Sequence, residues 1–268
     1  MSTTDVNDTG ELIGYQIQDL IENAITNQPR SLQRMIGPSE IGNPCTHCLA
    51  ARLASWTKTE TRVPWLPYIG TAVHEALQGI FDTLQQSRKP DDLEFWTERK
   101  VTVGTLAGKP ITGSADLFIP NVRGACTPGI NIDWKIVGKT TLDTVRRTHY
   151  PGQQYEIQAH LYGLGWENAG QKVSHVCVFF MPRNGMSLSG GYWWSAPYDP
   201  QIAKDALGRL ASLYTSMTAI TTALGAEGRD TWITGLDRNP DCWDCRKYPD
   251  WVNYTTPKIE QTTIDDII

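Results

Sequence analysis

The stretch GINIDWKIV (residues 129–137) is mostly apolar but carries polar side chains at alternate positions in its centre. Alternation of this kind is typical of a β-strand, whose successive side chains point to opposite faces of the sheet. One face would carry isoleucine and tryptophan, and the other would carry Asn131, Asp133 and Lys135. An acid and an amine on one face form either a plain ion pair, common on edge strands and across strands, or part of a chemical site.

The sequence around this strand switches between helical and strand patterns. Helices are expected where apolar residues recur at helical spacing, at residues 10–27, 68–87, 153–166 and 199–224, with shorter ones near 44–56 and 140–149. Strands are expected where apolar and polar residues alternate, at residues 94–104, 110–120, 173–181 and 189–197. The residues LAGK (106–109) predict a turn that joins the first two of these strands. This order of elements predicts an α/β fold with a central mixed β-sheet flanked by helices.

The composition narrows the class of protein. With 40% hydrophobic and 20% charged residues it is that of a globular chain, and no run of about 18 apolar residues predicts a membrane span. The N-terminus lacks the basic and then apolar pattern of a secretory signal, so a cytoplasmic location is expected. A net charge of −5 argues against a protein that coats nucleic acid without specificity, but an enzyme with a local basic groove is compatible with it.

The cysteines form two CxxC pairs near opposite ends of the chain, CTHC (45–48) and CWDC (242–245). In a reducing compartment this pattern predicts a four-thiolate metal site made of Cys45, Cys48, Cys242 and Cys245. A shared metal would staple the two flanks of the chain into one lobe. Spacing alone does not separate zinc from an iron–sulfur cluster. Cys126 and Cys177 stand outside the pairs and are expected to be ordinary loop and core cysteines.

Asp116 and Asp133 lie on strands that are expected to be neighbours, so their carboxylates can converge at one end of the sheet. Asp116 stands in GSADLF after small residues that let another group approach the backbone. Two convergent carboxylates repel each other, and the usual remedies are a shared proton or a divalent cation. On flanking helices, His74 in GTAVHEAL and the pair Gln158 and Tyr162 in QAHLY offer further polar groups, although each alone is more often ordinary packing.

Together, four motifs in this order resemble those of the RecB-type branch of the PD-(D/E)XK nuclease superfamily: GxxxH (70–74), GxxD (113–116), DxK (133–135) and QxxxY (158–162). This branch includes stand-alone phage exonucleases and CRISPR-associated RecB-like exonucleases, many with a cysteine-bound iron–sulfur cluster flanking the nuclease fold. The resemblance implies a restriction-endonuclease-like nuclease domain at residues 38–250. An N-terminal helical extension at 1–37 and an acidic tail at 251–268 would flank it.

The resemblance implies a role for each side chain around the two acids. His74, Asp116 and Asp133, with the backbone carbonyl of Trp134, would hold one Mg²⁺ or Mn²⁺. A nitrogen ligand tilts the preference towards Mn²⁺. Lys135 would contact the attacking water and the scissile phosphate, and a nearby dication would favour its neutral form.

The resemblance also bears on the helix beyond the sheet and on the cysteines. Gln158 and Tyr162 would position the water or the DNA backbone. Lys139, Arg146 and Arg147 are either phosphate contacts or a solvated charged face. The four flanking cysteines would bind a 4Fe-4S cluster, with Zn²⁺ as the alternative. The alternative stays open because the family pattern has one cysteine before the domain and three after it, whereas this chain has two and two.

The implied function is a metal-dependent DNA exonuclease that hydrolyses phosphodiester bonds in recombination, repair or replication. Its partner would be DNA with a free end or a single-stranded region, and no membrane. Two other classes stay open: a catalytically inactive DNA-binding or adaptor protein on the same fold, and a zinc-stapled structural subunit in which Asp133 and Lys135 are only an ion pair. An inactive relative has no physical need to keep buried charges together, and this favours the enzyme.

Overall fold

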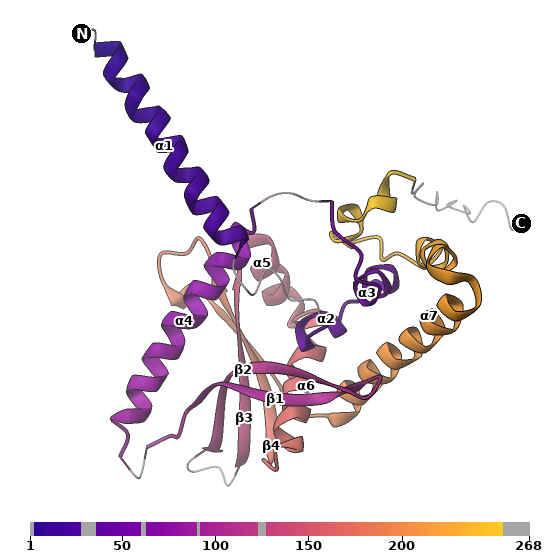
Figure 1. The fold of residues 1–268 in the computed structure, drawn as a ribbon. Coiled ribbons are helices and arrows are strands. Elements are labelled where there is room, and N and C mark those ends of the chain that lie inside the picture. The colour runs from indigo at the N-terminus through magenta and orange to yellow at the C-terminus, as the bar shows by residue number, and fades with distance from the viewer. Residues whose placement is uncertain (1–2, 28–35, 60–62, 90–91, 123–126, 254–268) are drawn as a thin grey trace, which may run out of the picture.

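The computed structural model describes residues 3–27, 36–59, 63–89, 92–122 and 127–253. Within them a five-stranded sheet has the order β1-β2-β3-β4-β5. Its strands are β1 (Trp96–Leu106), β2 (Lys109–Val122), β3 (Thr127–Val137), β4 (Val173–Pro182) and β5 (Tyr192–Pro197). β3 and β4 run parallel, and the other neighbours are antiparallel. The sheet is mixed and flanked by helices (Figure 1), which confirms the predicted α/β class.

The connections follow from the sequence between the strands. β1 and β2 are joined by a two-residue turn, Ala107 and Gly108, with φ angles of 49° and 75°. Positive φ at both central residues is the conformation of a type I′ hairpin turn, whose twist matches that of the strands. The parallel pair β3 and β4 needs a longer crossover. The helices α5 (Lys139–Thr148) and α6 (Gln153–Asn168) supply it, close to the ranges that the sequence predicts.

Helices cover both faces of the sheet. On one face α4 (Trp65–Gln86) packs Val73, Leu77 and Phe81 against the apolar side of β3, where Phe81 stacks on Trp134 at 5.8 Å. On the other face α6 contacts the sheet on one side and α7 (Pro200–Thr234) on the other, so most of its length is buried. β3 is therefore the central strand, and its acid and amine do not protect a sheet edge.

Phe118 is the aromatic centre of the core on the α6 face. Its side chain is fully buried and stacks on Trp166 with 4.3 Å between the ring centroids. β3 passes so close that a Cβ added to Gly129 would lie 2.2 Å from Cζ of Phe118. The glycine thus makes room for the ring, and no other residue fits there without displacing it.

We expect the Phe118→Ala substitution to lower the free energy of unfolding by about 3–5 kcal/mol, because it removes buried aromatic area and leaves a cavity beside Trp166. Chemical denaturation monitored by circular dichroism measures the change. Leu84→Ala, on the exposed side of α4, is the matched control and should change stability by less than about 0.5 kcal/mol. Similar losses for the two variants would contradict this account of the core.

Several helix boundaries differ from those expected. α7 continues to Thr234 instead of ending at 224, because Gly225 adopts a φ of 71° and lets the helix change direction there. α4 begins at Trp65 despite two nearby prolines, since Pro67 lies in the first turn, where a missing N–H costs little. Two apolar residues of α4, Ile80 and Leu84, are exposed to solvent.

The two flanks of the chain meet beside the sheet. The N-terminal part contains α1 (Thr3–Thr26), α2 (Pro38–Ile41) and α3 (Thr46–Leu53), and α1 extends away from the rest (Figure 1). The C-terminal part contains the short 3₁₀ helices η3 (Cys245–Lys247) and η4 (Pro249–Asn253), while η2 (Leu188–Gly190) precedes β5. The N–H of Thr59 donates to the carbonyl of Lys247 at 2.7 Å, and that of His47 to Asp237 at 3.2 Å.

Cys126 and most of the expected acidic tail, residues 254–268, lie outside the described residues. Within the described ranges, no helix combines the length and the apolar composition that crossing a membrane requires.

Candidate functional site

One cleft, of about 1270 Å³, collects side chains from α4, β2, β3 and α6. Every residue predicted for the nuclease site lines it: His74, Asp116, Asp133, Trp134, Lys135, Gln158 and Tyr162. These residues are far apart in the sequence, so the fold itself brings them together. The same cleft is bounded on the N-terminal side by the end of α1 and by the residues that precede and open α2 and α4.

His74 and Asp116 form the first half of the site. Nδ1 of His74 lies 3.3 Å from Oδ1 of Asp116 and 3.9 Å from Oε1 of Glu98 on β1. Ligand atoms of these three residues all lie within 4.8 Å of one another. A nitrogen and two carboxylates at this spacing could hold a divalent cation such as Mn²⁺ or Mg²⁺.

The backbone of Trp134 holds both of these side chains in place. Its N–H donates to Oδ2 of Asp116 at 2.8 Å, and its carbonyl lies 3.2 Å from Nε2 of His74. The Trp134 carbonyl therefore contacts Nε2 of His74, whereas the carboxylates contact Nδ1. The group that orients a metal-binding histidine usually contacts the ring nitrogen that does not bind the metal. That the Trp134 carbonyl is itself a metal ligand stays a prediction.

Asp133 and Lys135 form the second half. Both point to the α6 face of β3, as the alternation predicts, and their carboxylate and amine pair directly. The other Asp133 oxygen, Oδ1, accepts a hydrogen bond from Nε2 of Gln158 at 3.0 Å. Asp133 is nearly inaccessible to solvent, and the ring of Tyr155 lies 5.6 Å from the Lys135 amine. In this arrangement Lys135 and Gln158 each engage one Asp133 oxygen, and Asp133 is not among the three residues whose ligand atoms lie within 4.8 Å of one another. That Asp133 is a metal ligand stays a prediction.

The charged groups in the cleft shift one another's pKa values. Burial raises the pKa of Asp133 to about 6, although the charge of Lys135 acts in the opposite direction. Burial alone would lower the pKa of Lys135, but the charges of Asp133 and Asp116 outweigh it and raise that pKa. His74 behaves similarly: burial would lower its pKa, and the hydrogen bond and charge of Asp116 raise it. The protein groups thus keep Lys135 charged, and the neutral amine expected from the sequence requires a further positive charge nearby.

Glu98 is a site residue that the sequence reasoning missed. The pairing of β1 with β2 passes from Thr97 opposite Leu117 to Arg99 opposite Ala115, which leaves Glu98 across from Asp116. Its backbone has a φ of 47°, a region that residues other than glycine rarely adopt and that often marks functional sites. The residue type was visible in the sequence, but its place depends on the strand register.

The small residues before Asp116 have a structural explanation. A Cβ added to Gly113 would lie 2.9 Å from the hydroxyl oxygen of Tyr162 and 2.8 Å from Cγ of Pro38. The groups that approach the β2 backbone are therefore the chain's own tyrosine and proline. Burial raises the pKa of Tyr162, and the charges of Asp133 and Asp116 act in the same direction, so its hydroxyl stays protonated and able to donate.

The basic residues of α5 do not face the cleft in this structure. Lys139 pairs with Asp143 at 2.6 Å, and Arg146 lies 4.0 Å from the same carboxylate and donates to the carbonyl of Gly190. The solvated charged face is the better description of these side chains. The cleft is lined by other cations, Lys58 and Lys100.

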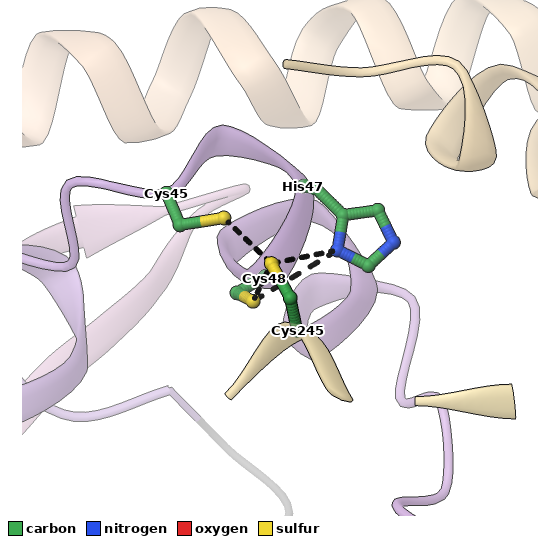
Figure 2. A group of neighbouring side chains, drawn as sticks. All are labelled: Cys45, His47, Cys48 and Cys245. Carbon is green, nitrogen blue, oxygen red and sulfur yellow. Dashed lines mark hydrogen bonds between the residues drawn. The ribbon is translucent and has the colours of Figure 1, made fainter. Parts of the chain in front are cut away.

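The four predicted metal-binding cysteines gather from both flanks of the chain. Sγ of Cys245 lies 3.3 Å from that of Cys45 and 3.4 Å from that of Cys48, and Cys242 lies 3.5 Å from Cys48. Three of them are buried and Cys242 is half-buried. A cluster of four thiols in one buried position could hold a metal. Figure 2 shows a further neighbour, His47, whose ring nitrogen points at two of the sulfurs.

The solved structures that this chain resembles include the following two. The crystal structure of SSO0001 is 13% identical to this chain, with a TM-score of 0.40, and the match covers 75% of this chain and 87% of that one. The crystal structure of a "Putative exonuclease" from Eubacterium rectale is 14% identical, with a TM-score of 0.44, and the match covers 87% of this chain and 93% of that one. No family model matches the sequence. No curated protein matches it either.

Proposed function

We propose that this chain is a divalent-metal-dependent deoxyribonuclease of the RecB-type branch of the PD-(D/E)XK superfamily, acting as an exonuclease in recombination, repair or replication. The observation that carries the proposal is the meeting of a carboxylate–histidine pair with a buried acid–amine pair in one cleft. An ion pair that served stability alone would gain nothing from a second group of acids beside it, because like charges repel.

The roles follow from the contacts. His74, Asp116 and Glu98 would hold a divalent cation, with Asp133 beside them as the further ligand that the motifs predict. When bound, the cation would polarise the phosphoryl oxygen and lower the pKa of water. The Trp134 backbone orients His74 and Asp116, so the ligands are arranged before substrate arrives. Lys135, held by Asp133, presents its amine to the scissile phosphate, while Gln158 fixes the carboxylate from α6.

The dimensions of the cleft fit a polymeric substrate better than a small molecule. Small-molecule sites usually occupy about 300–1000 Å³, and this cleft is larger at about 1270 Å³. Lys58 and Lys100 line it and offer charge to phosphates away from the reacting centre. Tyr68 lines it as well and offers a ring on which an unpaired base can stack. DNA with a free or single-stranded end is therefore the proposed substrate.

End-labelled single-stranded and duplex DNA, incubated with Mg²⁺, Mn²⁺ or EDTA, tests the proposal. We expect stepwise shortening from the ends with either cation, faster with Mn²⁺ because of the nitrogen ligand, and none with EDTA. Closed circular DNA is the matched control and should stay intact. Binding without cleavage in both cations would overturn the proposal in favour of an inactive DNA-binding protein.

A further inference from the structure

The cysteine cluster is too compact for the iron–sulfur cluster that the family resemblance implies. In a 4Fe-4S cluster each thiolate binds a different iron, so the cluster's own atoms separate the ligating sulfurs. Around a single zinc ion, with Zn–S bonds of about 2.3 Å, tetrahedral geometry places two sulfurs about 3.8 Å apart. The contacts here are 3.3, 3.4 and 3.5 Å. The sulfurs are in direct contact, which fits one ion and leaves no room for a cluster.

We propose that this site holds one zinc ion and that His47 is its fourth ligand, together with Cys45, Cys48 and Cys245. Nδ1 of His47 lies 3.8 Å from Sγ of Cys48 and 4.0 Å from Sγ of Cys245 (Figure 2). Tetrahedral zinc with one nitrogen ligand places nitrogen and sulfur about 3.6 Å apart. The four ligand atoms all lie within 4.8 Å of one another, and all four residues are buried.

The partner on the far side of the ring explains why His47 points at the sulfurs. Nε2 lies 2.9 Å from Oδ2 of Asp250, and Nη2 of Arg238 donates to the same oxygen at 2.5 Å. Because a carboxylate only accepts, Nε2 carries the hydrogen and the lone pair of Nδ1 faces the cysteines. A carboxylate behind a histidine is the usual outer partner of a zinc ligand, since it fixes the tautomer and the ring orientation.

Aromatic packing fixes the ring in this orientation. The His47 ring is fully buried and meets Trp56 and Tyr248 edge-on, at centroid distances of 5.9 and 5.7 Å. Cysteines that bind a metal are thiolates, and thiolates would repel the imidazole lone pair unless a cation lay between nitrogen and sulfur. The packing and the hydrogen bonds thus point to an ion between His47 and the sulfurs.

Cys242 then has a different place from the one the sequence predicts. Its Sγ touches Cys48, but the residue is half-buried and stands outside the group of four ligand atoms. In a zinc site with a histidine ligand it is a neighbouring thiol and can be replaced. If four cysteines bound the zinc, Cys242 would be required and His47 could be replaced. Substitution of these two residues therefore separates the two arrangements.

Metal analysis of the full chain, purified without oxygen, tests the choice between zinc and a cluster. We expect one zinc per chain, a colourless protein and no acid-labile sulfide. Four irons per chain with matching sulfide would overturn the proposal. This measurement does not depend on nuclease activity, so its outcome stands apart from that of the proposed function.

Substitutions test the ligand set, with zinc affinity read by competition against a chelator. His47→Ala should weaken zinc binding by more than 100-fold, and Asp250→Asn by about 10- to 100-fold, while Cys242→Ser should stay within about threefold of the unmodified chain. Should the alanine variant fail to fold, His47→Cys keeps four ligands and should shift the visible spectrum of the cobalt-loaded protein towards that of an all-sulfur site. Loss of zinc in Cys242→Ser but not in His47→Ala would overturn the assignment, as would an unchanged cobalt spectrum.

Discussion

DNA hydrolysis by the Lys135→Met variant should fall by about 10²- to 10⁴-fold, the range that a positioned proton-transfer or charged group contributes. Methionine keeps the length and the apolar stem of lysine but removes the amine that pairs with Asp133. Breaking a buried pair normally costs several kcal/mol, because one charge is left unpaired. Here the pKa of Asp133 is already raised to about 6 by burial. Without its partner Asp133 can take up a proton, so we expect the variant to remain folded.

Two further measurements separate catalysis from structure in this variant. DNA binding, followed by fluorescence anisotropy with Ca²⁺ in place of the reactive cation, should change by less than about threefold. Lys139→Met is the matched control, because that amine is exposed and pairs with Asp143 along α5. It should retain full activity. Activity above about a tenth of the unmodified level in Lys135→Met would remove the lysine from the proposed mechanism.

The Asp116→Asn variant should lose most of its affinity for the divalent cation and at least about 10³-fold in activity, which corresponds to about 4 kcal/mol. The amide keeps an oxygen that can accept from the Trp134 N–H, so the strand contact survives while the charge facing His74 disappears. Calorimetric titration with Mn²⁺ in the absence of DNA measures the loss directly. A titration curve like that of the unmodified chain would contradict the assigned ligand.

Two further variants test whether the loss of cation binding is specific to Asp116. Asp143→Asn removes an exposed carboxylate of α5 and should leave cation binding unchanged. Glu98→Gln tests the second acid of the group, 3.9 Å from His74, and should weaken Mn²⁺ binding less than Asp116→Asn because its contact is longer. If Glu98→Gln were the more damaging of the two, the cation would lie nearer β1 than proposed.

The sequence predicted those parts of the fold that depend on local pattern. The alternation in β3, the Ala-Gly turn between β1 and β2 and the apolar spacing of α4 each express a rule that acts within a few residues. The helix predicted at 199–224 ends too early, because Gly225 with its φ of 71° changes the direction of α7 and does not end it.

Site residues were predictable only where a motif identified them. The motifs led to His74, Asp116 and Lys135, and all three line one cleft. The place of Glu98 in the site depends on the register of β1 against β2. The orientation of His47 depends on a partner, Asp250, about 200 positions away in the sequence. No local pattern contains either relation. His47 did offer a signal, since it stands between two cysteines in CTHC and is itself a metal-binding residue type.

The Trp134 main chain ties the proposed cation-binding side chains to the middle of the sheet. Its amide and carbonyl engage Asp116 and His74 at the point where β2 and β3 run side by side. A slip of one residue between these strands would turn the acids to opposite faces. With the proposed ligands, affinity for the cation would arise only when this strand pair has formed in register, and Mn²⁺ uptake during refolding would time that event.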